Sequence, residues 1–316
     1  MVESMAYHFR PGLVGMGILT CISVSCSASS TAPPDDPVLA DLSGDYLGQQ
    51  PPGDVPAVFA PGLISGQRLH ATPSFSPDGN EIYWAVSGSG PGASRIWHSR
   101  RIGNQWTEAA PASFSESEQA DNPAVSSDGQ SLFFNSDRPV GGEARERIWR
   151  VERRSDGSWS DPSPVDPVIN DYPLHWQVSL DEDGGLYFGS ERDPSQGSDD
   201  IFHSEFRDGH FQMPENLGQP INTQDHESMP FIDPRERFLL FSRQSFGGSA
   251  GLFVSRRNTD GSWADPINVT LTRPEVQGEC PQLTPDGRFL FFLRYENGAF
   301  NVYWIDARFL RDLLGL

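Results

Sequence analysis

Imidazole and carboxylate side chains recur along the chain, each a few residues ahead of a short apolar stretch. They are His70, Asp121, His175, His226, Glu227 and Glu279. Side chains of these types bind divalent cations, and a pair of carboxyls is what hydrolysis of a glycosidic bond requires. The same groups can instead bond to the backbone amides of loops and face water. The sequence leaves these three interpretations open, and the elements that carry the residues decide whether they converge.

No other motif with a defined chemistry accompanies these residues. The sequence contains no HExxH, no phosphate-binding glycine loop and no dinucleotide-binding fingerprint. Cys280 stands beside Glu279 with no histidine at a matching spacing, so we expect a buried small residue and not a nucleophile. We therefore predict no catalytic residues and no cofactor, with a bound divalent cation such as Ca²⁺ as the alternative.

The charge of the chain excludes some classes of partner. With 43 acidic and 23 basic residues, the formal net charge is -20. Nucleic-acid binding depends on neutralising phosphates with Lys and Arg, so we expect no nucleic-acid partner. Adhesion to an anionic membrane face is disfavoured for the same reason. A solvated acidic surface is the simplest interpretation, and a cationic ligand or basic partner is the alternative.

A repeat of about fifty residues dominates the sequence. An apolar strand preceded by a turn recurs at 74–84, 124–134, 178–188, 231–241 and 282–292. A second strand follows in step at 95–99, 147–151, 200–204, 251–255 and 301–305. Asp-Gly turns supply the left-handed residues that tight hairpins need, and a Trp or Phe in most units is predicted to head a fourth strand. Four-stranded units that cannot bury both faces alone pack radially.

The repeats predict an all-β fold, a single β-propeller of about five four-stranded blades, with six as the alternative. The fifth unit stops near Asp306 and lacks a fourth strand. The segment 55–65 resembles the fourth strands of other units, so we expect it to complete the last blade and close the ring. On this basis residues 55–316 form the propeller, and the candidate residues lie just before the first strand of each blade, at one mouth of the central channel.

The N-terminus is typical of an export signal. Arg10 precedes an apolar stretch at 13–24 that is too short to span a bilayer, and small residues follow. We expect residues 1–26 to be a signal peptide of the lipoprotein type with Cys26 lipidated. Cys21 as the acceptor, or ordinary cleavage at 25–32, are the alternatives. Residues 27–54 are rich in Pro, Asp and Ser near their start and are expected to form a flexible linker.

The repeats resemble the WD-like propeller repeats of the TolB type, whose blades carry a Ser-Pro-Asp-Gly turn before an aromatic strand. That turn stands at 76–79, with Thr-Pro-Asp-Gly at 284–287, and Asn-Ser-Asp-Arg at 135–138 is similar to the segment that follows the strand. The resemblance covers about residues 46–316 and concerns the fold. TolB itself has six blades and a separate N-terminal domain that contacts envelope partners, so a role in the Tol system is not carried over.

The function expected from this combination is an exported, envelope-associated scaffold that binds a protein or polysaccharide without catalysis. The alternative is a glycosidase-like or ligand-sensing propeller with a polar site in the central funnel. We expect a monomer in the periplasm or on the outer membrane, attached to the membrane only through its lipid anchor.

Overall fold

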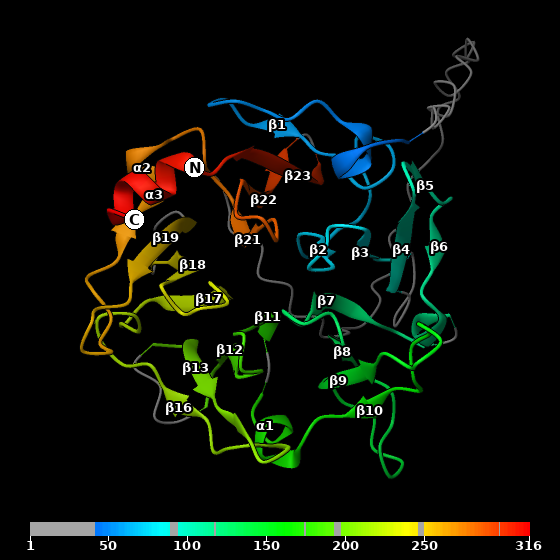
Figure 1. Ribbon diagram of the computed structural model, residues 1–316. Helices are drawn as coiled ribbons and strands as arrows, with labels where there is room; N and C mark the ends of the chain where they lie inside the picture. The colour runs from blue at the N-terminus through cyan, green and yellow to red at the C-terminus, as the bar shows by residue number, and fades with distance from the viewer. Residues whose placement is uncertain are drawn as a thin grey trace, which may run out of the picture. The chain divides into compact units, whose positions relative to one another are not determined.

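The computed structural model describes residues 42–88, 94–116, 118–173, 175–192, 197–245, 250–296 and 298–316, except for the side chains of His175 and Trp176. Within these residues, antiparallel sheets surround a common centre as five blades (Figure 1). In each blade the first strand lies innermost and the later strands follow outward. The predicted all-β propeller is therefore confirmed, with five blades and not the six of the alternative.

The blades consist of the following strands. The first contains β2 (Ser74–Phe75), β3 (Glu81–Val86), β4 (Arg95–Ile102) and β6 (Ala110–Pro111). The second contains β7 (Asp121–Val125), β8 (Ser131–Ser136), β9 (Arg147–Glu152) and β10 (Ser163–Pro164). The third contains β11 (His175–Leu180), β12 (Leu186–Ser190), β13 (Asp200–Ser204) and β16 (Glu215–Asn216). The fourth contains β17 (His226–Ile232), β18 (Phe238–Gln244), β19 (Ala250–Arg256) and β20 (Ile267–Asn268). The fifth contains β21 (Glu279–Leu283), β22 (Phe289–Glu296), β23 (Ala299–Asp306) and β1 (Ala57–Val58).

Helical segments are short and lie before, between or after the strands. They are the 3-10 turns η1 (Asp45–Gly48) and η2 (Ser113–Ser115) and the α-helices α1 (Pro167–Asn170), α2 (Val269–Thr272) and α3 (Arg308–Leu314). None of the helices in the described ranges is long and apolar enough to cross a lipid bilayer.

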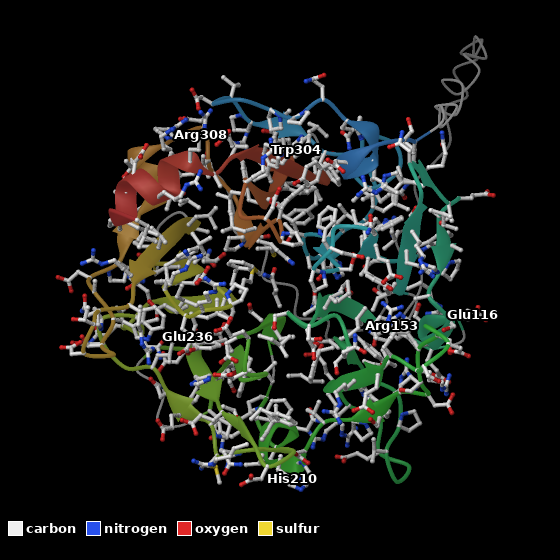
Figure 2. The ribbon with its side chains drawn as sticks, in the orientation of Figure 1. Glu116, Arg153, His210, Glu236, Trp304 and Arg308 are labelled. Carbon is white, nitrogen blue, oxygen red and sulfur yellow. The ribbon has the colours of Figure 1, made fainter. Side chains whose placement is uncertain are left out.

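The fifth blade is closed by the start of the chain, as predicted. In β1, Ala57 lies opposite Trp304 and Val58 opposite Tyr303 of β23 (Figure 2). Phe59 follows and is fully buried, with its ring 5.2 Å from that of Trp304. Because the two ends of the domain share one sheet, neither end can separate without opening the ring.

The propeller begins earlier in the chain than the sequence indicated. Residues 42–54 belong to the expected flexible linker, yet they pack on the blades. Leu47 is buried, the ring of Tyr46 meets that of Phe289 edge-on at 5.2 Å, and Trp106 Nε1 donates to the carbonyl of Gly44 at 2.8 Å. The contacts of Tyr46 and Leu47 and the hydrogen bond from Trp106 fix this segment on the blades, so residues 42–54 are not part of a flexible linker. The rest of the linker, the signal peptide and Cys26 lie outside the described residues.

The aromatic residue of each unit stands before the fourth strand and does not head it. Trp106 belongs to a two-residue strand, β5 (Gln105–Trp106), that pairs with the end of β4, and β6 begins four residues later. In the third blade, β15 (His210–Phe211) pairs likewise with β14 (Phe206–Arg207). The chain therefore makes a small hairpin at the end of the third strand before it returns along the blade.

The Asp-Gly turns form between the two inner strands of each blade. In the first blade, the Ser76 hydroxyl donates to Asp78 Oδ1 at 2.6 Å and accepts from the amide of Glu81 at 2.8 Å, while Gly79 has φ 67. Glycine adopts this left-handed conformation without a steric penalty. In the fourth blade Glu236 takes the glycine position with φ 52. The sequence of this turn, Asp-Pro-Arg-Glu at 233–236, lacks the Asp-Gly pair, and the turn keeps the left-handed backbone with a glutamate instead.

Candidate functional site

The predicted mouth residues lie at the start of the inner strands. Asp121, His175, His226 and Glu279 are the first residues of β7, β11, β17 and β21. His70 precedes β2, and its Nδ1 lies 3.2 Å from Asp121 Oδ2 in the next blade. The structure therefore brings His70 and Asp121 together. The side chain of His175 lies outside the described residues.

The contact between His70 and Asp121 joins a half-exposed imidazole to a nearly buried carboxylate. Its hydrogen bond to Asp121 raises the pKa of His70, although partial burial opposes the rise. Ser87 Oγ lies 3.1 Å from the other ring nitrogen. Both ring nitrogens thus have protein partners, and these contacts fix the orientation of the His70 ring beside Asp121.

Glu227 does not face the channel mouth. Its side chain is fully buried, accepts from Arg243 Nε at 2.7 Å, and accepts from the amide and hydroxyl of Thr223 at 2.9 and 2.7 Å. Burial raises the pKa of Glu227, against the opposing effects of Thr223 and Arg243. Glu227 therefore bonds to a loop amide, as one of the three interpretations expected, but it does not face water, and its bonds stabilise the loop that enters the fourth blade. The neighbouring His226 lies beside Ser198 and 3.8 Å from Asp199 Oδ2.

Glu279 and Glu146 extend the acidic character of the mouth. Burial raises the pKa of Glu279. The pKa of Glu146 is raised to about 7 by loss of solvation and by the negative charges of Asp121 and Asp137. Glu146 was not among the residues predicted for the mouth. It directly precedes the predicted strand 147–151 and therefore could have been assigned to the same end of the blade.

Five side chains at one repeat position close the channel below the mouth. They are Thr72, Asn122, Gln177, Met229 and Cys280. Gln177 Nε2 in the third blade donates to the carbonyl of Pro281 in the fifth at 3.0 Å. Cys280 Sγ lies 3.1 Å from Met229 Sδ. Cys280 is buried, as expected, and burial raises the pKa of its thiol. The side-chain oxygens of Asn122 and Gln177 are buried without a hydrogen-bond partner in the described part of the chain.

A cavity of ≈ 620 Å³ lies beyond these side chains, at the end of the channel that carries the Asp-Gly turns. Its wall includes a residue from every inner strand, and these are Ser74, Val125, Ser179, Ile232 and Leu283. Gln177 also lines it, and α3 contributes Leu310 and Arg311. The sequence predicted a ligand site only at the mouth, whereas the cavity opens at the opposite end of the same strands.

Comparison with known proteins identifies the fold. No protein-family model matches the chain, and no curated protein sequence matches it. A solved structure described as a putative TolB from Agrobacterium tumefaciens matches with a TM-score of 0.52 and 16% identity, over 77% of this chain and 78% of that one. The chain has the fold of a TolB-like β-propeller.

Other similar structures include a second TolB and a glycosidase. TolB from Acinetobacter baumannii matches with a TM-score of 0.47 and 15% identity over 75% of this chain, and the match spans about half (54%) of that protein. An alpha-L-arabinofuranosidase from Lactobacillus brevis matches with a TM-score of 0.46 and 14% identity, over 78% of this chain and 92% of that one. At these identities the likeness concerns the fold, and function must be argued from the side chains of the TolB-like propeller itself.

Proposed function

We propose that this TolB-like propeller is an exported, envelope-associated scaffold that binds a positively charged segment of a partner protein at its channel mouth, without catalysis. The observation that supports this most directly is the gathering of acidic side chains where strands begin at the mouth: Asp121 and Glu279 are the first residues of β7 and β21, and Glu146 directly precedes β9. Loss of solvation and the charges of Asp121 and Asp137 raise the pKa of Glu146 to about 7. A group of carboxylates at one place forms an electrostatic environment that a Lys or Arg side chain relieves.

The burial of Glu227 counts against the glycosidase alternative. A glycoside hydrolase needs two carboxyl groups that flank the scissile bond. Of the three carboxylates that the sequence suggested for this role, Glu227 is fully buried and paired with Arg243. Asp121 is held by His70 at 3.2 Å, which fits an orienting or binding role.

A divalent cation such as Ca²⁺ is the second candidate ligand of the same mouth. Calcium prefers oxygen ligands from carboxylates and amide carbonyls. The buried, unpartnered oxygen of Asn122 adjoins Asp121 in sequence, and that of Gln177 belongs to the same layer of side chains. Ordered water would satisfy these oxygens equally well, so the ion requires its own measurement.

Export and anchoring follow from the N-terminal sequence and are tested there. Metabolic labelling with a fatty acid should mark the wild-type protein and fail to mark Cys26→Ser, while Cys21→Ser serves as the matched control. Labelling that survives Cys26→Ser would move the anchor to another residue. Light scattering of the purified protein would test the expectation of a monomer.

Crosslinking in the protein's own envelope tests the binding proposal. The mouth variant combines Asp121→Asn, Glu146→Gln and Glu279→Gln, and the control combines Glu108→Gln, Asp161→Asn and Glu205→Gln, three exposed carboxylates elsewhere on the surface. Both lose three negative charges. We expect one dominant crosslinked protein that the mouth variant loses and the control retains, and whose capture weakens with added salt. Capture of a glycan would assign a polysaccharide ligand instead, and equal capture by both variants would refute binding at the mouth.

A further inference from the structure

Two junctions between neighbouring blades have the same side-chain plan. Between the first and second blades, the ring of Tyr83 stacks on His98, and Arg153 stacks on Trp159. Between the third and fourth blades, Tyr187 stacks on His203 at 4.2 Å, and Arg257 stacks on Trp263. The strand registers place Tyr83 opposite His98 and Tyr187 opposite His203, so the two pairs are equivalent.

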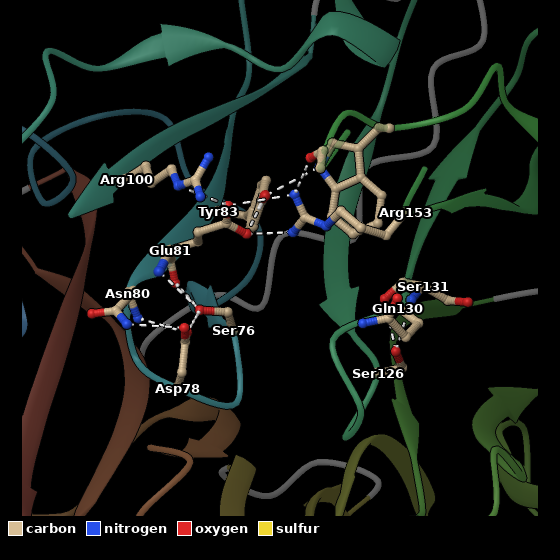
Figure 3. A network of polar contacts seen from close by, with 12 residues as sticks. Ser76, Asp78, Asn80, Glu81, Tyr83, Arg100, Ser126, Gln130, Ser131 and Arg153 are labelled. Atoms are coloured by element: carbon tan, nitrogen blue, oxygen red, sulfur yellow. Dashed lines mark hydrogen bonds and ion pairs between the residues drawn. The ribbon is translucent and has the colours of Figure 1, made fainter. Parts of the chain in front are cut away.

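The first junction is neutralised by arginine. Glu81 accepts a hydrogen bond from the Tyr83 hydroxyl at 3.0 Å and is paired with Arg153 and Arg100 (Figure 3). The residue that precedes the turn of this blade, at the position that Asp181 has in the third blade, is Ser76, which carries no charge. One carboxylate therefore faces two guanidinium groups, and no further cation is required.

The second junction has the opposite balance. Asp181 stands in the place of Ser76. Glu236 of the fourth blade, which Figure 2 labels, accepts the hydrogen bond of the Tyr187 hydroxyl. Within the described residues, no ion pair joins Arg257 to either carboxylate. Two carboxylates and one imidazole thus converge with no ion pair to an arginine among the described residues, and their ligand atoms all lie within 4.8 Å of one another.

The ligand atoms that Asp181 and His203 offer have no hydrogen bonds that would compete with a metal ion. Asp181 uses Oδ1 to accept from the amides of Asp183 and Gly185, which leaves Oδ2 available. His203 Nε2 is buried with no hydrogen-bond partner in the described residues, and it lies 3.5 Å from Asp181 Oδ2. That contact is an ion pair only if His203 is protonated. A neutral imidazole would instead offer its lone pair to a metal ion.

Two residues specific to this junction, Gly185 and Glu236, accommodate the cluster. Gly185 occupies the strand position that Glu81 has in the first blade, and a Cβ there would lie 2.3 Å from Asp181 Oδ2 and 2.8 Å from His203 Nε2. Glu236 replaces the turn glycine of the other blades and takes its left-handed conformation, with φ 52. A left-handed conformation is unfavourable for a non-glycine residue, and a ligand role for the carboxylate would offset that cost.

We propose that Asp181, His203 and Glu236 form a binding site for a divalent transition-metal ion, with Zn²⁺ as the representative, that joins the third blade to the fourth. One imidazole and two carboxylates suit zinc or manganese better than calcium or magnesium, which prefer oxygen alone. The Tyr187 hydroxyl, which bonds to Glu236, orients that ligand from outside the metal's own shell. The site is separate from the channel mouth and does not depend on its function.

The test compares Zn²⁺ binding in the metal-stripped full protein and in three variants, by calorimetry with excess Ca²⁺ present to occupy oxygen-only sites. Glu236→Gly restores the turn residue of the other blades, and His203→Gln removes the imidazole. His98→Gln changes the equivalent histidine of the first junction and is the matched control. We expect one Zn²⁺ per chain for the wild type and for His98→Gln, and a loss of affinity of at least about 100-fold for the other two variants.

Thermal unfolding gives an independent measure. At a Zn²⁺ concentration about 100 times Kd, we expect the Tm of the wild type to rise by about 5 °C. The Tm of Glu236→Gly should not respond to Zn²⁺, although its metal-free form should be folded and no less stable than the wild type. Absence of Zn²⁺ binding by the wild type would overturn the proposal. Retention of binding in Glu236→Gly would equally overturn the proposal.

Discussion

Arg243 Nε donates to Glu227 Oε1 at 2.7 Å, and no part of the Glu227 side chain reaches solvent. The same guanidinium donates to the carbonyl of Ile221 at 2.8 Å. This pair therefore ties the loop before β17 to the fourth blade. Arg138, Arg192 and Arg294 donate likewise to the carbonyls of Phe114, Asp171 and Gln277 in the loops that enter their own blades.

Glu227→Gln should destabilise the protein. Breaking a buried ion pair leaves the remaining charge without compensation, so we expect the free energy of unfolding to fall by about 3 kcal/mol. Urea denaturation measures the change. Glu205→Gln is the control, because Glu205 and Arg207 form an exposed pair at 3.7 Å whose loss should cost less than about 1 kcal/mol. Wild-type stability in Glu227→Gln would contradict the structural role.

Ring closure predicts that the first strand stabilises the whole domain. Phe59 is fully buried between the rings of Phe291 and Trp304, at 4.8 and 5.2 Å. Phe59→Ala should lower the free energy of unfolding by about 4 kcal/mol, and deletion of 55–65 should lower the melting temperature of the entire propeller. Val55→Ala, at a side chain that is 75% exposed, should change stability by less than about 0.5 kcal/mol. A deletion variant that melts like the full protein would refute closure.

Much of the fold could be predicted because each blade repeats the same local signals. The Asp-Gly turn at Gly79 and the apolar strand after it recur with a fixed period, and radial packing follows from units that cannot bury both faces. The early packing of Tyr46 and Leu47 could not be predicted in this way. Their segment matches no repeat, and its burial depends on aromatic neighbours such as Phe289 that are distant in the sequence.

The candidate site was harder to predict because the inner strands carry irregularities. In β17 the register shifts between Ser228 and Phe231, and Met229 has φ 54. Such a bulge changes which side chains face the channel, and adjacent residues of a strand point to opposite sides. Glu227 therefore points into the blade. The contacts of Glu236 were hidden for a different reason, since they join turns and strands from two separate repeats.

The pair formed by Glu81 and Arg153 predicts strong coupling between the first two blades. Arg153 Nη1 lies 3.4 Å from Glu81 Oε1, a second contact joins Nη2 to the other oxygen, and the guanidinium stacks 3.7 Å from the Trp159 ring centroid. Both side chains are mostly buried. A double-mutant cycle with Glu81→Gln and Arg153→Met should give a coupling free energy of about 2 kcal/mol in urea denaturation.

The matching control cycle uses Arg154 and Asp161, which lie 3.7 Å apart on the surface with the Asp161 side chain fully exposed. Solvent screens such a pair, so its coupling should stay below about 0.5 kcal/mol. Equal coupling in the two cycles would mean that burial and stacking on Trp159 add nothing to the contact between the blades.

Glu146 predicts how stability depends on pH. Its pKa is raised from 4.5 to about 7 in the folded protein, so between these values the folded chain holds a proton that the unfolded chain has released. The contribution of this group to stability is therefore complete below about pH 4.5 and is lost as pH rises through 7. Glu146→Gln, which cannot ionise, should be more stable than the wild type at pH 8 and equal to it at pH 4. Because part of Glu146 still meets solvent, which screens its charge, we expect at most about 1 kcal/mol. Urea denaturation across this pH range measures the difference, with Asp161→Asn, which removes an exposed carboxylate elsewhere on the surface, as the control. A difference for Glu146→Gln that did not change with pH would show that neither loss of solvation nor the charges of Asp121 and Asp137 act on this carboxyl.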